Sequence, residues 1–143
     1  MRRSDPWQRG RQAHPPVVAG RAEEQAERDG RLRRRLSVAE LTVIGKGKAK
    51  PGCEAALERE LRTNVRATHL EEGCLHYSLH RSLEDPSLFI TIERWASKEV
   101  LDQHFATPRL QNLLKQAADL LVSSPVITVF EQLRVGQSPK DNF

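Results

Sequence analysis

Residues 74–95 read CLHYSLHRSLEDPSLFITIERW, and this stretch decides the fold. Its two ends are typical of β-strands, and Glu84-Asp85-Pro86 between them is a turn signal. The stretch therefore predicts an antiparallel hairpin of two strands, 74–81 and 88–95. The rest of the fold can be worked out by asking which elements precede and follow this hairpin.

Two elements are expected before the hairpin. Residues 41–50 begin with LTVI, a β-forming run, and predict a strand that ends at Pro51-Gly52. Between residues 54 and 72, leucine and valine recur on one helical face, which predicts a helix. Gly73 stands where a helix C-cap glycine belongs.

Three elements are expected after the hairpin. Ser97 is a suitable N-cap for a short helix through about Phe105. Thr107-Pro108 predicts a second helix with an apolar stripe, which Pro125 ends. Residues 126–130 form the last predicted strand. The order β-α-β-β-α-α-β is that of a ferredoxin-like α+β fold, with the helices on one face of a four-stranded antiparallel sheet.

The other face of this sheet is expected to be apolar. Val43, Ile90 and Ile92, together with Val126 or Ile127, cannot all point at the helices, because neighbours on a strand alternate between faces. A large exposed apolar patch indicates a partner. The simplest partner is a second copy packed sheet to sheet, so we expect a homodimer.

The charge distribution separates a tail from a body. The 143 residues carry a net charge of +4, yet the first 37 hold ten arginines, no lysine and five acidic residues. We expect 1–37 to be a disordered Arg-rich extension, 38–134 a folded domain and 135–143 a flexible C-terminal tail. A nucleic-acid-binding fold would carry its basic patch on the folded part, so no nucleic-acid partner is expected.

The sequence also argues against several locations and sites. No apolar run approaches the ~18 residues of a membrane span, and no apolar segment follows the N-terminal arginines as in a signal peptide. We therefore expect a cytoplasmic protein without a membrane partner. Cys53 and Cys74 form no CxxC pair, which argues against a disulfide framework or a cysteine-based zinc site. His76 and His80 are about 13 Å apart along a strand at ~3.3 Å per residue, too far for one metal ion.

The residues that remain gather around the hairpin. Phe89, Thr91, Glu93 and Trp95 share one face of its second strand by the period of two. Tyr77 lies on the other strand, and His104 lies in the short helix that folds back over the sheet. A tryptophan, a tyrosine and a histidine in a cleft between sheet and helices make a suitable pocket for a flat aromatic ligand.

These motifs resemble those of the antibiotic biosynthesis monooxygenase (ABM) domain, especially its quinol monooxygenase members. The resemblance covers roughly 41–133, and it rests on Gly73-Cys74-x-x-Tyr77, Asp85-Pro86 followed by Phe89, Glu93-x-Trp95, and Leu101-x-x-His104-x-x-Thr107-Pro108. It implies a dimeric α+β barrel that oxygenates phenols or quinols with O2, without flavin or metal. The first strand, residues 41–45, lacks the asparagine of haem-degrading relatives, which argues against haem degradation as the function.

The resemblance suggests a role for each candidate residue. His104 is the expected base and Glu93 a second catalytic residue, while Trp95, Tyr77 and Phe89 are expected to bind a small aromatic substrate. Structural roles stay open for all of these residues: Glu93 in particular is expected to pair with a base or to cap a backbone donor. Arg94 points away from Trp95 and is expected to form a dimer salt bridge. Two other functions stay open, a non-catalytic module that binds a small aromatic ligand and an isomerase or hydrolase on the same fold.

Overall fold

The computed structural model describes residues 19–141, and the chain divides into two compact units between Arg33 and Arg34. Helix α1 (Ala19–Val38) begins in the first unit, and its exposed side chains form i, i+4 pairs such as Gln25 with Asp29. The expected extension 1–37 thus contains a helix from residue 19 onward, and its first 18 residues lie outside the described ones. That this extension is disordered in solution stays a prediction.

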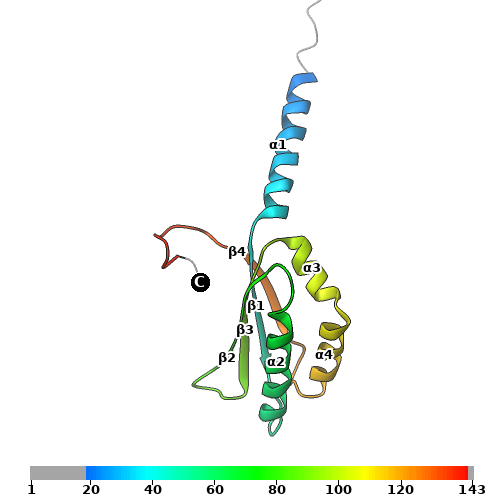
Figure 1. The fold of residues 1–143 in the computed structure, drawn as a ribbon, viewed down its shortest axis with the longest axis vertical. Coiled ribbons are helices and arrows are strands. Elements are labelled where there is room, and N and C mark those ends of the chain that lie inside the picture. The colour runs from blue at the N-terminus through cyan, green and yellow to red at the C-terminus, as the bar shows by residue number, and fades with distance from the viewer. Residues whose placement is uncertain (1–18, 142–143) are drawn as a thin grey trace, which may run out of the picture. The chain divides into compact units, whose positions relative to one another are not determined.

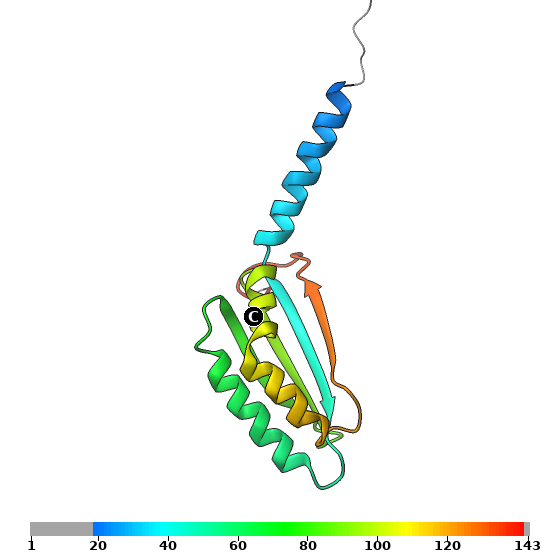
Figure 2. The same ribbon diagram turned by 90° about the vertical axis from the view of Figure 1, so that its right-hand side faces the viewer.

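The second unit is a ferredoxin-like α+β domain. Its elements are β1 (Leu41–Lys48), α2 (Glu54–Thr68), β2 (Cys74–Arg81), β3 (Leu88–Trp95), α3 (Lys98–Ala106), α4 (Pro108–Ala118) and β4 (Val126–Glu131). The four strands form one antiparallel sheet in the order β2-β3-β1-β4. Helices α2, α3 and α4 all lie on one face of it (Figures 1 and 2). The predicted fold class is therefore confirmed.

The predicted helix starts are confirmed, but two predicted helix ends are wrong. Helix α4, expected to continue until Pro125 ends it, already ends at Ala118. The Ser97 hydroxyl accepts a hydrogen bond from the Val100 amide at 3.3 Å, and Thr107 caps α4 with Pro108 at its first turn. Helix α2, expected to reach residue 72, ends at Thr68. Gly73 lies in the following turn at φ +84°, where a Cβ would come within 2.5 Å of Val100. A tight turn, rather than a helix cap, requires this glycine.

The core lies between the sheet and the helices. Phe89, Thr91, Glu93 and Trp95 of β3 are all buried there, which confirms the predicted alternation. One apolar cluster comprises Val43, Tyr77, Trp95 and Leu101, and a second comprises Ala49, Leu57, Phe89, Ala117 and Leu121. Buried polar side chains accompany them, namely Asn64, Thr68, Thr91, Glu93 and His104.

The opposite face of the sheet carries the expected apolar side chains. By the strand register, Val43 faces the helices while Ile90 and Ile92 face away from them. On the edge strand β4, Val126 and Phe130 of this open face are 61% and 44% exposed. Arg94 also lies on the open face, but it pairs with Glu40 of its own chain. A dimer salt bridge is therefore not needed to satisfy its charge.

Candidate active site

The site is centred on two stacked rings, those of Trp95 and His104. Trp95 ends β3, and the cap at Ser97 starts α3 at once, so the helix turns back over the sheet. This return brings His104 against Trp95 with ring centroids 4.4 Å apart and planes inclined by 36°. Both side chains are almost fully buried. The predicted proximity of the two residues is therefore what the fold produces.

Glu93 is a buried carboxylate held by neutral donors. Its Oε2 accepts a hydrogen bond from Trp95 Nε1 at 3.0 Å, and its Oε1 accepts one from Thr91 Oγ1 at 2.9 Å. The expectation that Glu93 pairs with a base or caps a backbone donor is wrong, because its two oxygens are bonded to side-chain donors of its own strand, β3. Such hydrogen bonding compensates for much of the cost of burying a carboxylate.

Tyr77 joins this carboxylate to helix α2. Asn64 Nδ2 donates to the tyrosine oxygen at 3.0 Å, and the ring stands nearly perpendicular to that of Trp95. Burial raises the pKa of the Tyr77 hydroxyl far above its ordinary value, and the negative charge of Glu93 raises it further. Tyr77 is therefore a neutral hydrogen-bonding group at any physiological pH.

Glu71 and Arg109 complete the polar cluster, and sequence reasoning missed both. Glu71, in the turn between α2 and β2, holds His104 Nδ1 at 2.8 Å through its Oε2. Arg109 of α4 donates to the other oxygen of Glu71, to Asn64 Oδ1, and to Thr68 Oγ1 at 3.2 Å. A carboxylate only accepts hydrogen bonds, so Nδ1 of His104 carries the proton and Nε2 is left to act as a base.

A small cavity adjoins this cluster between the sheet and the helices. It has a volume of about 90 Å³, and its lining includes Tyr77, Phe89, Glu93 and His104. Four of the five predicted site residues thus face one space. Trp95 is the exception, since it packs behind His104 and does not line the cavity. Its predicted contact with a substrate ring would therefore need a rearrangement of the pocket.

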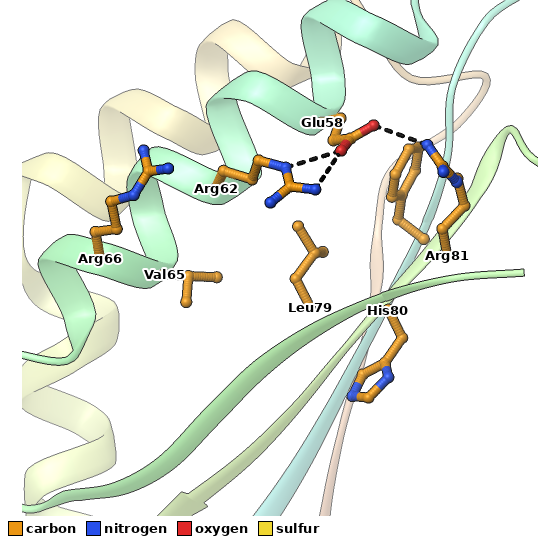
Figure 3. A pocket seen from close by; sticks show the side chains of 8 residues that line it. Glu58, Arg62, Val65, Arg66, Leu79, His80 and Arg81 are labelled. Carbon is orange, nitrogen blue, oxygen red and sulfur yellow. Dashed lines mark hydrogen bonds and ion pairs between the residues drawn. The ribbon is translucent and has the colours of Figure 1, made fainter.

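A larger hollow of about 310 Å³ lies elsewhere, between α2 and β2 (Figure 3). Figure 3 shows Glu58 between Arg62 and Arg81, which donate to its two oxygens at 2.8 and 2.9 Å. These arginines lower the pKa of Glu58, mainly through the hydrogen bond from Arg62. The carboxylate is therefore a poor proton acceptor, and the ion pairs serve to connect α2 with β2. The buried cluster around His104 is the better candidate site.

Other reactive side chains have structural explanations. Burial, followed by the charges of Glu71 and Glu93, raises the pKa of the Cys74 thiol to about 11, so it is a poor nucleophile. His76 and His80 both hydrogen-bond to the Ser78 hydroxyl between them, at 2.9 and 2.8 Å. Across residues 19–141, no group of three or more His, Cys, Asp or Glu side chains is placed to hold a metal ion. No helix in that range is long and apolar enough to cross a membrane.

The fold and the site define a class: a ferredoxin-like α+β domain with a buried histidine–carboxylate cluster beside a small cavity. Residues 41–116 match the family model described as antibiotic biosynthesis monooxygenase, and the chain belongs to that family. "Putative monooxygenase Rv0793" of Mycobacterium tuberculosis is 30% identical over 93 residues, which are 65% of this chain and 91% of the relative.

Two solved structures show the same fold. PA3566 from Pseudomonas aeruginosa is 35% identical, with a TM-score of 0.63 over 67% of this chain and 96% of that one. The structure of Rv0793 has a TM-score of 0.64 at 27% identity, and the match covers 69% of this chain and 100% of that one.

Proposed function

We propose that this protein is a monooxygenase that oxidises a quinol or polyphenol with O2 and needs no cofactor. The observation that carries the proposal is the buried His104, whose Nδ1 is held by Glu71 while its ring faces the cavity. A fixed imidazole beside a mainly apolar cavity is suited to remove a proton from an aromatic hydroxyl. The family description and the name of Rv0793 support monooxygenation as the reaction class.

The reaction uses the substrate as its own electron donor. His104 Nε2 takes a proton from a ring hydroxyl, and the resulting anion passes one electron to O2. The two radicals combine at a ring carbon, and the peroxide takes the proton back from His104. Loss of the ring hydrogen as a proton, with cleavage of the O–O bond, releases water. One oxygen atom stays on the ring as a carbonyl, so a dihydroxy aromatic and O2 give a hydroxyquinone and water.

The other predicted residues would support this chemistry in different ways. Glu93 and Tyr77 would line the polar part of the cavity, and Phe89 would pack against the ring of the substrate. Trp95 would act through His104, whose ring it contacts. Glu71 would hold the imidazole in its basic tautomer and stabilise the imidazolium once the proton has moved.

We also propose that two copies pack sheet to sheet as a homodimer. The support is the open face, where Ile44, Ile90 and Ile92 lie beside the exposed Val126 and Phe130. Covering this face would remove apolar area from water at a gain of about 25 cal/mol per Å².

The direct test of the activity is oxygen consumption. Purified protein with reduced 2-methyl-1,4-naphthoquinone (menadiol) should consume oxygen faster than the buffer does, with one O2 used per quinol oxygenated and the hydroxyquinone identified by mass. Uptake no faster than the buffer rate across a panel of quinols and polyphenols would overturn the proposal. Binding of these compounds without turnover would favour the non-catalytic ligand-binding module instead.

A further inference from the structure

The cavity beside His104 has a polar end and an apolar end. Its polar end is formed by Tyr77, Glu93 and His104, and its other end is lined by leucines of α4 and by Ile127 of β4. In the register of the sheet, Glu93 lies opposite Val43, whereas Phe89 lies opposite Gly47. At ~3.3 Å per residue, Glu93 and Phe89 are therefore separated by roughly 13 Å along the strands, and Ile127, opposite Gly45, lies midway along this path.

Two glycines form the floor between these ends. Gly45 and Gly47 of β1 lie on the face of the sheet that the helices cover, and neither has a positive φ. The backbone therefore does not require glycine here, although glycine weakens a strand. A Cβ at position 45 would lie 2.6 Å from Thr91 Oγ1, and one at position 47 would lie 3.0 Å from Leu121 Cδ2. The two glycines therefore leave room for the Thr91 and Leu121 side chains and add no side chain of their own to the cavity.

The apolar end leads to the surface beside β4. A second hollow, of about 530 Å³, shares Leu114, Leu121, Pro125 and Ile127 with the inner cavity. The Leu121 side chain lies over Gly47 at this junction. No helix covers β4 in Figure 2, and Ile127 and Val129 on its helix side are 42% and 49% exposed. The lining of the hollow is mainly apolar, and the Nζ atom of its Lys50 donates to the Asp119 carbonyl at 3.0 Å.

The inner cavity alone is too small for an aromatic ring. A cavity of ~150 Å³ accommodates benzene, whereas this one has about 90 Å³. A ring next to His104 therefore needs more space than the inner cavity provides, and the adjoining apolar hollow, which shares Leu121 with it, offers that space.

We infer that the substrate carries an apolar substituent of several carbons, an inference that rests on the oxygenation proposed above. The hydroxylated ring lies toward His104, and the substituent passes over Gly45 and Gly47 and leaves the domain between α4 and β4. The substrate class is thus an alkyl- or isoprenoid-substituted quinol, rather than a bare polyphenol.

The test compares two quinones that differ only in the length of this substituent, 2-methyl-1,4-naphthoquinone and 2-hexyl-1,4-naphthoquinone, both of which keep the ring hydrogen that oxygenation removes. Their dissociation constants are measured from the quenching of Trp95 fluorescence in a Trp7→Phe background, because these are the two tryptophans of the chain. The hexyl compound should bind at least tenfold more tightly, since two buried methylene groups already give about that factor. Equal affinity for the two quinones would overturn the inference.

Two variants test whether the tighter binding of the hexyl compound depends on the proposed exit between α4 and β4. Gly47→Val fills the floor and Ile127→Ser removes the apolar rim, so each should reduce the preference for the hexyl compound to less than threefold. Val126→Ser is the matched control, because this residue lies on the same strand but on the opposite face. If Gly47→Val fails to fold, the Ile127→Ser and Val126→Ser pair still decides. An equal loss of preference in these two would contradict the proposed path.

Oxygen uptake with the two reduced compounds separates this inference from the proposed function. If the hexyl compound binds more tightly but neither quinol consumes oxygen, the inferred binding path is supported and the proposed oxygenation is overturned. Turnover of both quinols with equal kcat/KM and equal affinity would support the oxygenation and overturn the inferred substrate class.

Discussion

His104 lies where an aromatic contact and an ion-pair network meet. Its ring contacts Trp95, and its Nδ1 is bonded to Glu71, which Arg109 also holds. Both contacts would exist in a purely structural histidine. A catalytic base differs from a structural histidine because its Nε2 must receive a proton from the substrate. A substitution that removes this basic nitrogen but keeps a polar side chain of similar size at position 104 tests the difference.

His104→Gln should lower kcat by about 10²- to 10⁴-fold, the usual contribution of a positioned general base. Oxygen-electrode measurements at saturating quinol give kcat for the parent and for the variant. His80→Gln is the control, since this exposed histidine lies on the other face of the sheet. A kcat within a few-fold of the parent, together with a lower melting temperature, would instead assign His104 a structural role.

At the scale of elements, the β2–β3 turn shows how one carboxylate stabilises the hairpin. Asp85 Oδ1 accepts hydrogen bonds from the Ser87 amide at 3.1 Å and from the Ser87 hydroxyl at 2.5 Å, while Lys48 lies 2.9 Å from Oδ2. Ser87 first, and then Lys48, lower the pKa of Asp85 to about 2. The folded state therefore holds this carboxylate ionised where the unfolded chain would protonate it.

This difference predicts an acid-dependent loss of stability. A lowered folded-state pKa contributes stability that is complete above about pH 4 and is lost as the pH falls toward 2. Asp85→Asn should therefore flatten the pH dependence of the urea midpoint between pH 4 and 2. Asp102→Asn, which removes an exposed aspartate paired with Lys98, should leave that slope unchanged. Parallel slopes for the parent and Asp85→Asn would contradict the assignment.

At the scale of the whole molecule, the open face of the sheet and the charged N-terminal segment lead to separate expectations. The open face is apolar at its centre, so it should be covered by a second copy. The described part of the N-terminal segment up to Leu32 has exposed side chains, so it has no core to contribute.

Ile92→Lys should convert the proposed dimer to a monomer. A lysine at the centre of the open face would be buried without a partner, at a cost that a sheet-to-sheet interface cannot offset. Light scattering at micromolar concentration should find twice the monomer mass for the parent and the monomer mass for the variant. Leu83→Lys, at a fully exposed position of the β2–β3 turn, should leave the dimer intact. A monomeric parent would overturn the proposal.

Deleting residues 1–36 should leave the thermal midpoint and any oxygen uptake nearly unchanged, because the segment is poor in apolar residues and its described side chains up to Leu32 are exposed. Differential scanning calorimetry of the full and shortened chains checks this. A decrease of several degrees in the midpoint would mean that the segment stabilises the folded domain.

The sequence by itself determined the strands, the starts of the helices and the alternation of buried side chains in β3, all of which depend on near neighbours along the chain. The period of two in β3 decides which of its side chains are buried, and the caps at Ser97 and Thr107 decide where α3 and α4 begin. These signals reside within a few residues of the position they describe. For the same reason, the stacking of His104 on Trp95 followed from a strand that turns directly into a short helix.

Only the tertiary structure decided which polar side chains meet across the domain. Glu71 reaches His104 and Arg109 from 33 and 38 residues away, and Arg94 finds Glu40 at a separation of 54. Such pairs depend on the sheet register and on how α2 and α4 pack over it, and no local pattern encodes them. Gly45 and Gly47 are a further example, because their role under the cavity follows from the Thr91 and Leu121 side chains that lie above them. The physical reason is that local signals select backbone conformations, while a binding site is made of side chains brought together by long-range packing.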